Sequence, residues 1–246
     1  MSDYIIGRNA VIEYLNNKDG AEKLFIQKGE LKGSVLKIIG IAKEQKLIIV
    51  EADKRKLDEM TENGNHQGVV LLASDYKYSS LNEIMESCEN SERDPLVVIL
   101  DEITDPHNLG AIIRTCEAAG ANGVIIPKRR SATVTHTVHK TSAGATTYMK
   151  VAKVTNIVQT IETLKDNGFW IYGADGQADT AYTDIDYSGK VCLVIGNEGK
   201  GISQSVKKHC DMLSYIPMYG KTESLNASTS AAVYIYEVLR SRNAKK

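Results

Sequence analysis

The spacing of apolar residues predicts two kinds of segment in the first third of the chain. Helical spacing is found over residues 11–15 and 34–45. Short apolar runs typical of buried strands lie at residues 23–26, 47–50 and 68–73. Residues 1–75 are therefore predicted to form a small α/β domain.

From residue 95 onward the pattern changes to apolar strands that alternate with helical segments. Runs rich in Val, Ile and Leu, with little polar alternation, lie at residues 96–100, 123–126, 148–154, 169–174, 191–195 and 213–216. Such runs are typical of strands covered on both faces, as in a parallel sheet flanked by helices. We predict an α/β fold with a parallel-sheet domain over residues 95–246. The polar stretch 76–94, which surrounds one short helical pattern, is predicted to be a linker.

Composition excludes several classes of protein. Of the 246 residues, 42% are hydrophobic and 25% are charged, which is ordinary for a globular chain and excludes a disordered one. No apolar run approaches the roughly 20 residues of a membrane-spanning helix, and the N-terminus lacks an export signal, so we expect a cytoplasmic protein. The four cysteines are widely scattered without metal-ligand spacing, which favours reduced thiols in the core and no metal site.

Ligands of parallel sheets bind in loops beyond the carboxyl ends of strands, and three such loops carry unusual residues. The first, residues 101–110, leads into a helix that carries Arg114. Asp105 or Asn108 would cap this helix. An arginine is most often a solvated surface residue, but small side chains around Arg114 leave room for a ligand or another backbone. These neighbours on adjacent turns are Gly110, Ala111, Thr115 and Ala118.

The second loop, residues 196–201, holds three glycines that permit unusual backbone angles and expose amide groups. It matches neither the phosphate-binding P-loop nor the glycine pattern of dinucleotide-binding enzymes. A plain turn would explain the glycines, but it would not require Glu198.

The third loop runs from Ile216 to residue 230 and precedes a final helix that ends near Arg242. One of Ser224, Asn226 and Ser228 is expected to cap that helix. Residues 224–230 contain four hydroxyl groups and one amide, more than a cap needs. Such small polar groups suit a sugar or an amino-acid head group.

Charge along the chain is uneven although the formal net charge is only -1. Residues 118–161 contain no Asp or Glu. This window carries the basic side chains Lys128, Arg129, Arg130, Lys140, Lys150 and Lys153, together with His136 and His139. A local basic surface fits contact with phosphates, although a solvated loop could have the same composition.

The three loops together resemble the three motifs of the SpoU family of RNA ribose 2'-O-methyltransferases, within the SPOUT superfamily. The matching segments are Asn108-Leu109-Gly110-Ala111-Ile112-Ile113-Arg114, Ile195-Gly196-Asn197-Glu198-Gly199-Lys200-Gly201, and Ile216-Pro217-Met218 with Ser224-Leu225-Asn226-Ala227-Ser228. The N-terminal segments Gly7-Arg8-Asn9-Ala10-Val11 and His66-Gln67-Gly68-Val69-Val70 are similar to the RNA substrate-binding domain of RlmB-type 23S rRNA guanosine methyltransferases, which has an L30e-like fold.

The resemblance implies a methyltransferase domain whose C-terminal segment forms a deep trefoil knot. It also implies a homodimer with each active site near the subunit interface. The cofactor would be S-adenosylmethionine, held largely by main-chain groups. The residues implied to bind it are Gly196, Ile216, Leu225, Thr141, Ser142, Gly176 and Ser228.

Methyl transfer to a ribose hydroxyl requires alignment of the reacting atoms and stabilisation of a developing alkoxide. Arg114 would stabilise that oxyanion or contact the target phosphate, because a guanidinium normally stays protonated and makes a poor general base. Asn108 would orient the ribose or Arg114, and Glu198 would organise its loop, pair with Arg114 or face the positive end of the cofactor. Ser224 and Asn226 would bind substrate or cofactor. RNA contacts are expected from Arg8, Lys128, Arg129, Arg130 and His136.

The substrate implied by the N-terminal resemblance is a guanosine in the peptidyl-transferase region of 23S rRNA. Two alternatives stay open: a tRNA ribose 2'-O-methyltransferase, and an RNA-binding protein without catalytic activity. A dinucleotide-dependent enzyme is disfavoured because the glycine fingerprint and its downstream acidic residue are missing.

Overall fold

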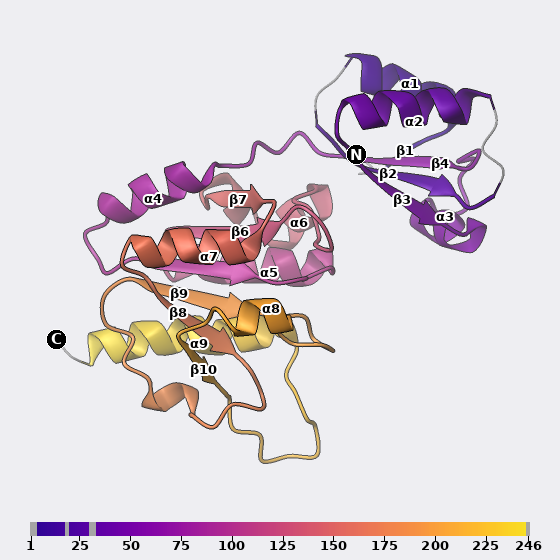
Figure 1. The fold of residues 1–246 in the computed structure, drawn as a ribbon. Coiled ribbons are helices and arrows are strands. Elements are labelled where there is room, and N and C mark those ends of the chain that lie inside the picture. Colours follow the sequence, from indigo (N-terminus) through magenta and orange to yellow (C-terminus); the bar gives the residue numbers. More distant parts are fainter. Residues whose placement is uncertain (1–3, 18–19, 30–32, 245–246) are drawn as a thin grey trace. The chain divides into compact units, whose positions relative to one another are not determined.

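The computed structural model describes residues 4–17, 20–29 and 33–244, and it divides the chain into two compact units, Met1–Lys77 and Tyr78–Lys246 (Figure 1). Helix α4 (Leu81–Glu89) lies within the stretch predicted to be a linker. It begins with a capping box, in which the Ser80 hydroxyl accepts from the Glu83 amide and the Glu83 carboxylate accepts from the Ser80 amide. Ile84 and Cys88 of α4 are buried in the core of the second unit. Residues 78–94 therefore differ from an open linker because they are part of that unit.

The first unit is built on a mixed four-stranded sheet in the order β1-β4-β2-β3. Its elements are β1 (Tyr4–Ile6), α1 (Arg8–Asn17), β2 (Ala21–Gln27), α2 (Ser34–Glu44), β3 (Ile48–Ala52), α3 (Lys54–Met60) and β4 (Val69–Ala73). β2 and β3 are parallel, whereas β4 is antiparallel to both of its neighbours. The sequence pattern did not reveal β1 or α3, because three and seven residues are too few to show a clear period.

Alternation along β2 gives each face of this sheet its own core. Leu24 and Ile26 are buried with residues of α1 and α2, including Val11 and Ile38. The intervening Phe25 packs with a separate cluster around Leu57 of α3. Figure 1 shows α1 and α2 over one face and α3 against the other.

The second unit contains a six-stranded sheet in the order β10-β8-β9-β5-β6-β7, and every neighbouring pair is parallel. This confirms the predicted parallel-sheet domain. Its strands are β5 (Leu96–Leu100), β6 (Gly123–Pro127), β7 (Val151–Val154), β8 (Trp170–Ala174), β9 (Val191–Ile195) and β10 (Met212–Ser214). The trefoil knot stays a prediction.

Two strands of the second unit differ from their predicted ranges by two or more residues at one end. The strand predicted over residues 148–154 begins only at Val151, because the chain first forms the short helix η1 (Ala145–Thr147) and exposes Tyr148. The strand predicted over 213–216 ends at Ser214, so Tyr215 and Ile216 are free to form part of a pocket wall.

Helices cover both faces of the second sheet. α4, α7 (Ile157–Asp166) and α8 (Gln204–Lys207) share one apolar core with the strands. α5 (Pro106–Ala118), α6 (His136–Thr141) and α9 (Ala227–Asn243) pack together over the other face, and the short helix η2 (Tyr182–Asp184) contacts α9 (Figure 1). Within the described residues, no helix combines the length and hydropathy that a bilayer span requires.

The cysteines behave as core residues, as predicted. Cys88, Cys116 and Cys192 are buried, Cys210 is partly buried, and all four are free thiols. Burial raises the pKa of Cys88 to about 11 and that of Cys210 to about 12. These thiols therefore stay protonated and unreactive at neutral pH.

A single arginine ties the end of α9 to the starts of two central strands. Arg242 donates through Nη1 to the carbonyl oxygen of Asp94 at 2.6 Å and through Nε to that of Tyr187 at 3.0 Å. Its Nη2 donates to the carbonyl oxygens of Pro95 at 3.0 Å and Gly189 at 2.8 Å. Pro95 directly precedes β5, and Gly189 lies two residues before β9. The C-terminal half of α9 is thereby fixed to the amino ends of the sheet.

We expect Arg242→Ala to lower the free energy of unfolding of the second unit by about 2–4 kcal/mol, because four carbonyl oxygens lose a charged donor. Urea denaturation followed by circular dichroism measures this change. Arg129→Ala is the matched control, since Arg129 is exposed and has no hydrogen bond within the described residues; its effect should stay within about 0.5 kcal/mol. Equal losses in the two variants would contradict the anchoring role.

Candidate functional site

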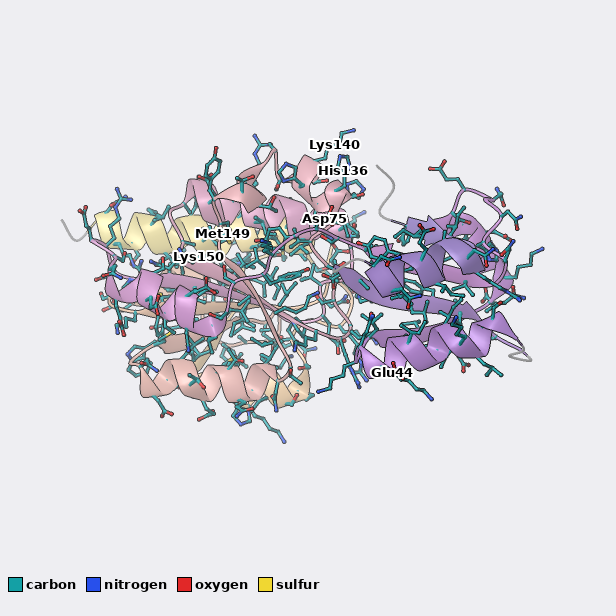
Figure 2. The ribbon with its side chains drawn as sticks, turned by 90° about the horizontal axis from the view of Figure 1, so that it is seen from above. Glu44, Asp75, His136, Lys140, Met149 and Lys150 are labelled. Atoms are coloured by element: carbon teal, nitrogen blue, oxygen red, sulfur yellow. The ribbon has the colours of Figure 1, made fainter. Side chains whose placement is uncertain are left out.

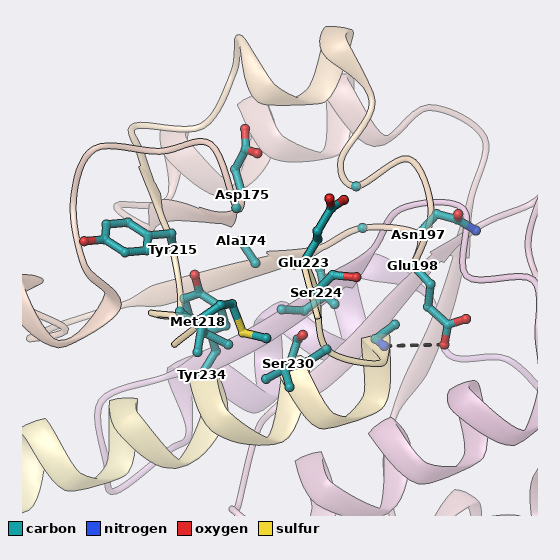
Figure 3. Close-up of a pocket in the computed structure, with 17 residues that line it drawn as sticks. Ala174, Asp175, Asn197, Glu198, Tyr215, Met218, Glu223, Ser224, Ser230 and Tyr234 are labelled. Atoms are coloured by element: carbon teal, nitrogen blue, oxygen red, sulfur yellow. Dashed lines mark hydrogen bonds between the residues drawn. The ribbon is translucent and has the colours of Figure 1, made fainter. Parts of the chain in front are cut away.

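The carboxylate of Glu198 joins three segments that are far apart in the sequence. Its Oε1 accepts hydrogen bonds from Asn108 Nδ2 and from Asn226 Nδ2, the latter at 2.6 Å. Asn226 Nδ2 also donates to Asn108 Oδ1 at 3.0 Å. The backbone amide of Ala227 completes the set at 3.4 Å from Glu198 Oε1, and the dashed line in Figure 3 marks this bond. We call this group of Asn108, Glu198 and Asn226 the carboxylate junction.

Local structure explains why the two asparagines reach Glu198. Asn108 lies in the first turn of α5, whose N-cap is Asp105; the Asp105 side chain accepts from the His107 amide at 2.8 Å. Asn226 is the N-cap of α9, and its Oδ1 accepts from the amide of Ser228 at 2.9 Å. The remaining half of the Asn226 amide is thus free to donate into the junction. The structure therefore assigns the two expected caps to Asp105 and Asn226.

The loop that carries Glu198 is held in a tight turn. Asn197 and Gly201 exchange two backbone hydrogen bonds, of 3.0 and 2.8 Å. A Cβ atom at Gly196 would lie 2.2 Å from the backbone carbon of Gly201, so no larger residue fits there. Gly201 has φ of 64°, in the left-handed region that favours glycine. Two of the three glycines are thus required by the fold of the loop itself.

A cavity of about 380 Å³ opens beside the junction. Its walls come from the ends of β8, β9 and β10 and from the start of α9. Three carboxylates, Asp175, Glu198 and Glu223, stand around it in Figure 3. Among the described residues that line the cavity there is no lysine or arginine. Asp175 is paired with Lys207 at 2.6 Å, so the negative charge of the cavity comes from Glu198 and Glu223. The cavity is therefore suited to a ligand with positive charge rather than to a polyanion.

Six of the residues predicted for catalysis or cofactor binding line this cavity. They are Gly176, Gly196, Glu198, Ile216, Ser224 and Leu225. Asn108 and Asn226 lie behind the wall and reach it through Glu198. The Ser228 hydroxyl donates to Asn226 Oδ1 at 2.6 Å, so it supports the junction without lining the cavity.

Thr141 and Ser142 lie elsewhere, at the end of α6 and against α5. The Thr141 hydroxyl donates to the carbonyl oxygen of Thr137, and the buried Ser142 hydroxyl donates to that of His139. Both residues pack against Gly110 of α5, where a Cβ atom would lie 2.7 Å from Thr141 Cβ. In a single chain these two hydroxyls donate to carbonyl oxygens of their own helix, and neither residue lines the cavity.

Arg114 is exposed on α5 and does not line the cavity. Within the described residues it makes no hydrogen bond or ion pair with another side chain. It lies six residues beyond Asn108, which is about 9 Å along the helix axis. The expectation that Glu198 pairs with Arg114 is not what the structure shows, because Glu198 is hydrogen-bonded to the two asparagines instead.

The predicted RNA-binding residues lie in both units. Lys128, Arg129 and Arg130 are exposed in the loop after β6, and Arg130 pairs with Glu102 at 3.1 Å. His136 begins α6, and Figure 2 shows it beside Lys140 on the outer side of that helix. Arg8 begins α1 of the first unit.

Sequence reasoning missed several residues that line the cavity. Asp175 directly follows β8, so the rule on strand ends could have found it; it pairs with Lys207 at 2.6 Å. Tyr234 lies in the middle of α9, so the rule on strand ends could not have found it. Burial raises the pKa of Tyr234 to about 12, and its hydroxyl donates to the carbonyl oxygen of Ser214 at 2.5 Å. The remaining lining residues outside the predicted site are Ala174, Ile195, Asn197, Gly201, Tyr215, Met218, Glu223, Ala227 and Ser230.

Comparison with known protein families matches both units. The description "SpoU rRNA Methylase family" matches residues 95–236, and "RNA 2'-O ribose methyltransferase substrate binding" matches residues 4–79. The chain is 44% identical over 241 residues to the putative TrmH family tRNA/rRNA methyltransferase YacO of Bacillus subtilis, covering 98% of this chain and 96% of that protein. It is also 44% identical over 239 residues to a protein of the same description from Staphylococcus haemolyticus, covering 97% and 96%.

Solved structures show the same fold. The A. aeolicus TrmH/SpoU tRNA modifying enzyme is 30% identical with a TM-score of 0.58, covering 67% of this chain and 83% of that one. The SpoU methyltransferase AviRb from Streptomyces viridochromogenes, crystallised in complex with AdoMet, is 23% identical with a TM-score of 0.62 and covers 98% and 90%.

Close packing at Gly110 leads to a prediction about stability. We expect Gly110→Ala to lower the free energy of unfolding of the second unit by about 1–3 kcal/mol, because the added methyl group meets Thr141 and the backbone of α6. Gly40→Ala in α2 is the control, since a Cβ atom there meets nothing within 4 Å. That variant should stabilise the first unit by up to about 1 kcal/mol through helix propensity. Stabilisation by both alanines in chemical denaturation would show that α5 and α6 are not in contact at Gly110.

Proposed function

The chain belongs to the SpoU rRNA methylase family of RNA methyltransferases, and we propose that it transfers a methyl group from S-adenosylmethionine to a ribose 2'-hydroxyl of RNA. The observation that carries the proposal is the acidic cavity beside the carboxylate junction. The junction joins the three segments that carry the family resemblance.

The residues of the cavity fit this cofactor. S-adenosylmethionine carries a sulfonium, an ammonium and one carboxylate, so its net charge is positive. Two of the three carboxylates that line the cavity, Glu198 and Glu223, have no cationic partner among the described residues. Ile195, Ile216 and Leu225 add apolar wall suited to a flat base, and Gly176 and Gly196 leave main-chain groups accessible. A dinucleotide would instead bring phosphate charges close to Asp175 and Glu223. When bound, S-adenosylmethionine supplies a methyl group that its sulfonium charge makes electrophilic.

Arg114 is proposed to act on the RNA side of the reaction. An exposed guanidinium stays protonated at neutral pH and offers five N–H donors. It can therefore stabilise the negative charge that develops on the 2'-oxygen, or hold the adjacent phosphate. Because Arg114 does not line the cavity of its own chain, the bound RNA must bridge the two, or a second copy of the chain must bring its Arg114 to the cavity. A homodimer with the site near its interface is part of this proposal.

The carboxylate junction positions the wall that faces the substrate. Glu198 holds the starts of α5 and α9, and Ser224 lies two residues before the Asn226 cap with its hydroxyl group at the cavity. We assign Ser224 to hydrogen bonding with substrate or cofactor, and Asn108, Asn226 and Ser228 to positioning. Thr141 and Ser142 do not line the cavity of their own chain. They could contact the cofactor only if α6 moved, or if they reached the cavity of a second chain.

The proposed substrate is a guanosine in 23S rRNA. The match of residues 4–79 to a substrate-binding domain supports a large structured RNA. Basic residues exposed on the second unit, Lys128 and Arg129 among them, would contact its backbone. A tRNA substrate is the alternative, because the similar A. aeolicus protein is described as a tRNA modifying enzyme. Mapping 2'-O-methyl positions in rRNA and tRNA from cells with and without the protein decides between them.

Calorimetry tests the cofactor directly. Titration of the purified protein with S-adenosylmethionine should give saturable binding, whereas NAD should give none. Binding of NAD alone would overturn the proposed function.

The role of Arg114 predicts a separation of binding from chemistry. Arg114→Ala should reduce methyl transfer to RNA by about 10²–10³-fold, the usual loss when a donor to a developing oxyanion is removed, while S-adenosylmethionine still binds. Arg93→Ala, an exposed arginine before β5, should retain normal transfer. Near-normal turnover by the Arg114→Ala variant would show that Arg114 has no role in the reaction.

The carboxylate junction predicts that substitutions of Glu198 lower methyl transfer and cofactor affinity to different extents. Glu198→Ala leaves the amides of Asn108 and Asn226 without their shared acceptor, so both methyl transfer and S-adenosylmethionine affinity should fall by tenfold or more, roughly the effect of one lost charged hydrogen bond. Glu198→Gln keeps one acceptor oxygen and should lose less. Activity is compared at saturating cofactor and RNA. If Glu198→Ala is as active as the wild-type protein, Glu198 has no role beyond the turn in which it lies.

A further inference from the structure

The first unit contains a polar cavity of its own, of about 600 Å³, which lies within the range of roughly 300–1,000 Å³ typical of ligand sites. It lies where the starts of α1 and α3 meet the end of β2 and the loop before β4. We call it the basic basin, because Arg8, Lys28 and Lys54 line it. Arg8 was expected to contact RNA, whereas Lys28 and Lys54 carried no signal in the sequence.

The charge of the basin is largely unpaired. Lys28 and Lys54 are exposed and have no anionic partner among the described residues. Asp58 is the only carboxylate among the described lining residues, and its Oδ1 contacts His66 Nε2 at 3.0 Å. Three cations around one engaged carboxylate leave the basin positive, in contrast to the acidic cavity of the second unit.

The loop that forms one wall is held in shape by buried polar contacts. The His66 side chain is only 6% exposed, and its Nδ1 accepts from the Gly68 amide at 3.0 Å. Since Nδ1 is an acceptor, the proton of the neutral ring lies on Nε2 and is donated to Asp58. Gln67 and Gly68 adopt φ of 51° and 79°, which turns the loop sharply. The Asp58–His66 pair thus stabilises a turn that presents Asn65 and Gln67 to the basin.

This turn also orients Arg8. The Arg8 amide donates to Gln67 Oε1 at 3.2 Å, and Arg8 Nε donates to the Gln67 carbonyl oxygen at 3.1 Å. The two terminal nitrogens of Arg8 have no partner among the described residues. A guanidinium held by Nε, with its terminal donors available, is prepared to bind a phosphate.

We propose that the basic basin binds one phosphate-bearing nucleotide of a single-stranded RNA segment. Arg8, Lys28 and Lys54 hold the phosphate, and the side-chain amides of Asn65, Gln67 and Gln27 offer hydrogen bonds to a base edge or to the 2'-hydroxyl. The choice of RNA rests on the proposed function. The basin gives the first unit a defined nucleotide site that is separate from the acidic cavity.

The salt dependence of RNA affinity tests the basin in the full-length protein. The probe is a fluorescein-labelled 12-nucleotide single-stranded RNA of mixed sequence, measured by anisotropy. Lys28→Gln with Lys54→Gln should weaken binding about tenfold and reduce the slope of log K against log salt by up to about 0.7, the value for one lost single-strand phosphate contact. Lys37→Gln with Lys43→Gln on α2 removes the same charge outside the basin, and should change neither quantity. Equal effects of the two pairs would overturn the proposal.

Crosslinking locates the contact without relying on charge. The same RNA with 4-thiouridine, irradiated on the full-length protein, should label peptides that contain Arg8 or residues 54–68. Labelling confined to the second unit would overturn the basin. A methyl-transfer assay on RNA separates this outcome from the proposed function: if the basin variants bind RNA normally while the protein still methylates RNA, only the basin is wrong. If RNA binds the basin but no methyl transfer occurs, only the proposed function is wrong.

Discussion

One carboxylate, that of Glu198, fixes the geometry on which the candidate site depends. This carboxylate is exposed, but the Asn108 side chain beside it is buried and needs a hydrogen-bond acceptor, which Glu198 supplies. Asn226, at the start of a second helix, donates to the same carboxylate oxygen. Without Glu198, the Nδ2 group of Asn108 would lose its acceptor, although Asn108 Oδ1 would still accept from Asn226 Nδ2. The loop after β9 is thus held to α5 and α9 at one point. The cavity lies directly beside that point, with Glu198 in its lining.

Helix α9 is held at both ends, and this explains how a long C-terminal helix can form one wall of the cavity. Asn226 caps its start and joins the carboxylate junction, whereas Arg242 near its end binds four carbonyl oxygens at the amino ends of the sheet. The part of the cavity wall that α9 supplies is therefore held at both ends of the helix. Arg114, by contrast, is exposed and available to RNA or to a second chain. In the proposed function, the cavity holds the cofactor and the exposed side with Arg114 faces the substrate, an arrangement that suits an enzyme acting on a large polymer.

The sequence pattern predicted the central strands of the second unit well, but it did not predict which side chains of the site contact one another. The bounds of β5 and β9 agree with the prediction because each is a continuous apolar run that must be buried on both faces. The short strand β1 and helix α3 lack a readable period. The pairing of Glu198 with two asparagines could not be predicted, since it depends on how distant segments meet. Helix geometry could have shown that Arg114 and Asn108 point apart, because six residues turn the helix about 600°, leaving the two side chains roughly 120° apart.

Methyl transfer to the ribose oxygen is the central claim, and alkaline hydrolysis of labelled RNA tests it most directly. RNA incubated with the protein and S-adenosylmethionine labelled in its methyl group is hydrolysed in base, which cleaves wherever a free 2'-hydroxyl can attack its phosphate. A methyl group on that oxygen blocks cleavage, so the account predicts label in dinucleotides that resist base. Label in mononucleotides would place the methyl group on a base, and absence of label from RNA would contradict the account altogether.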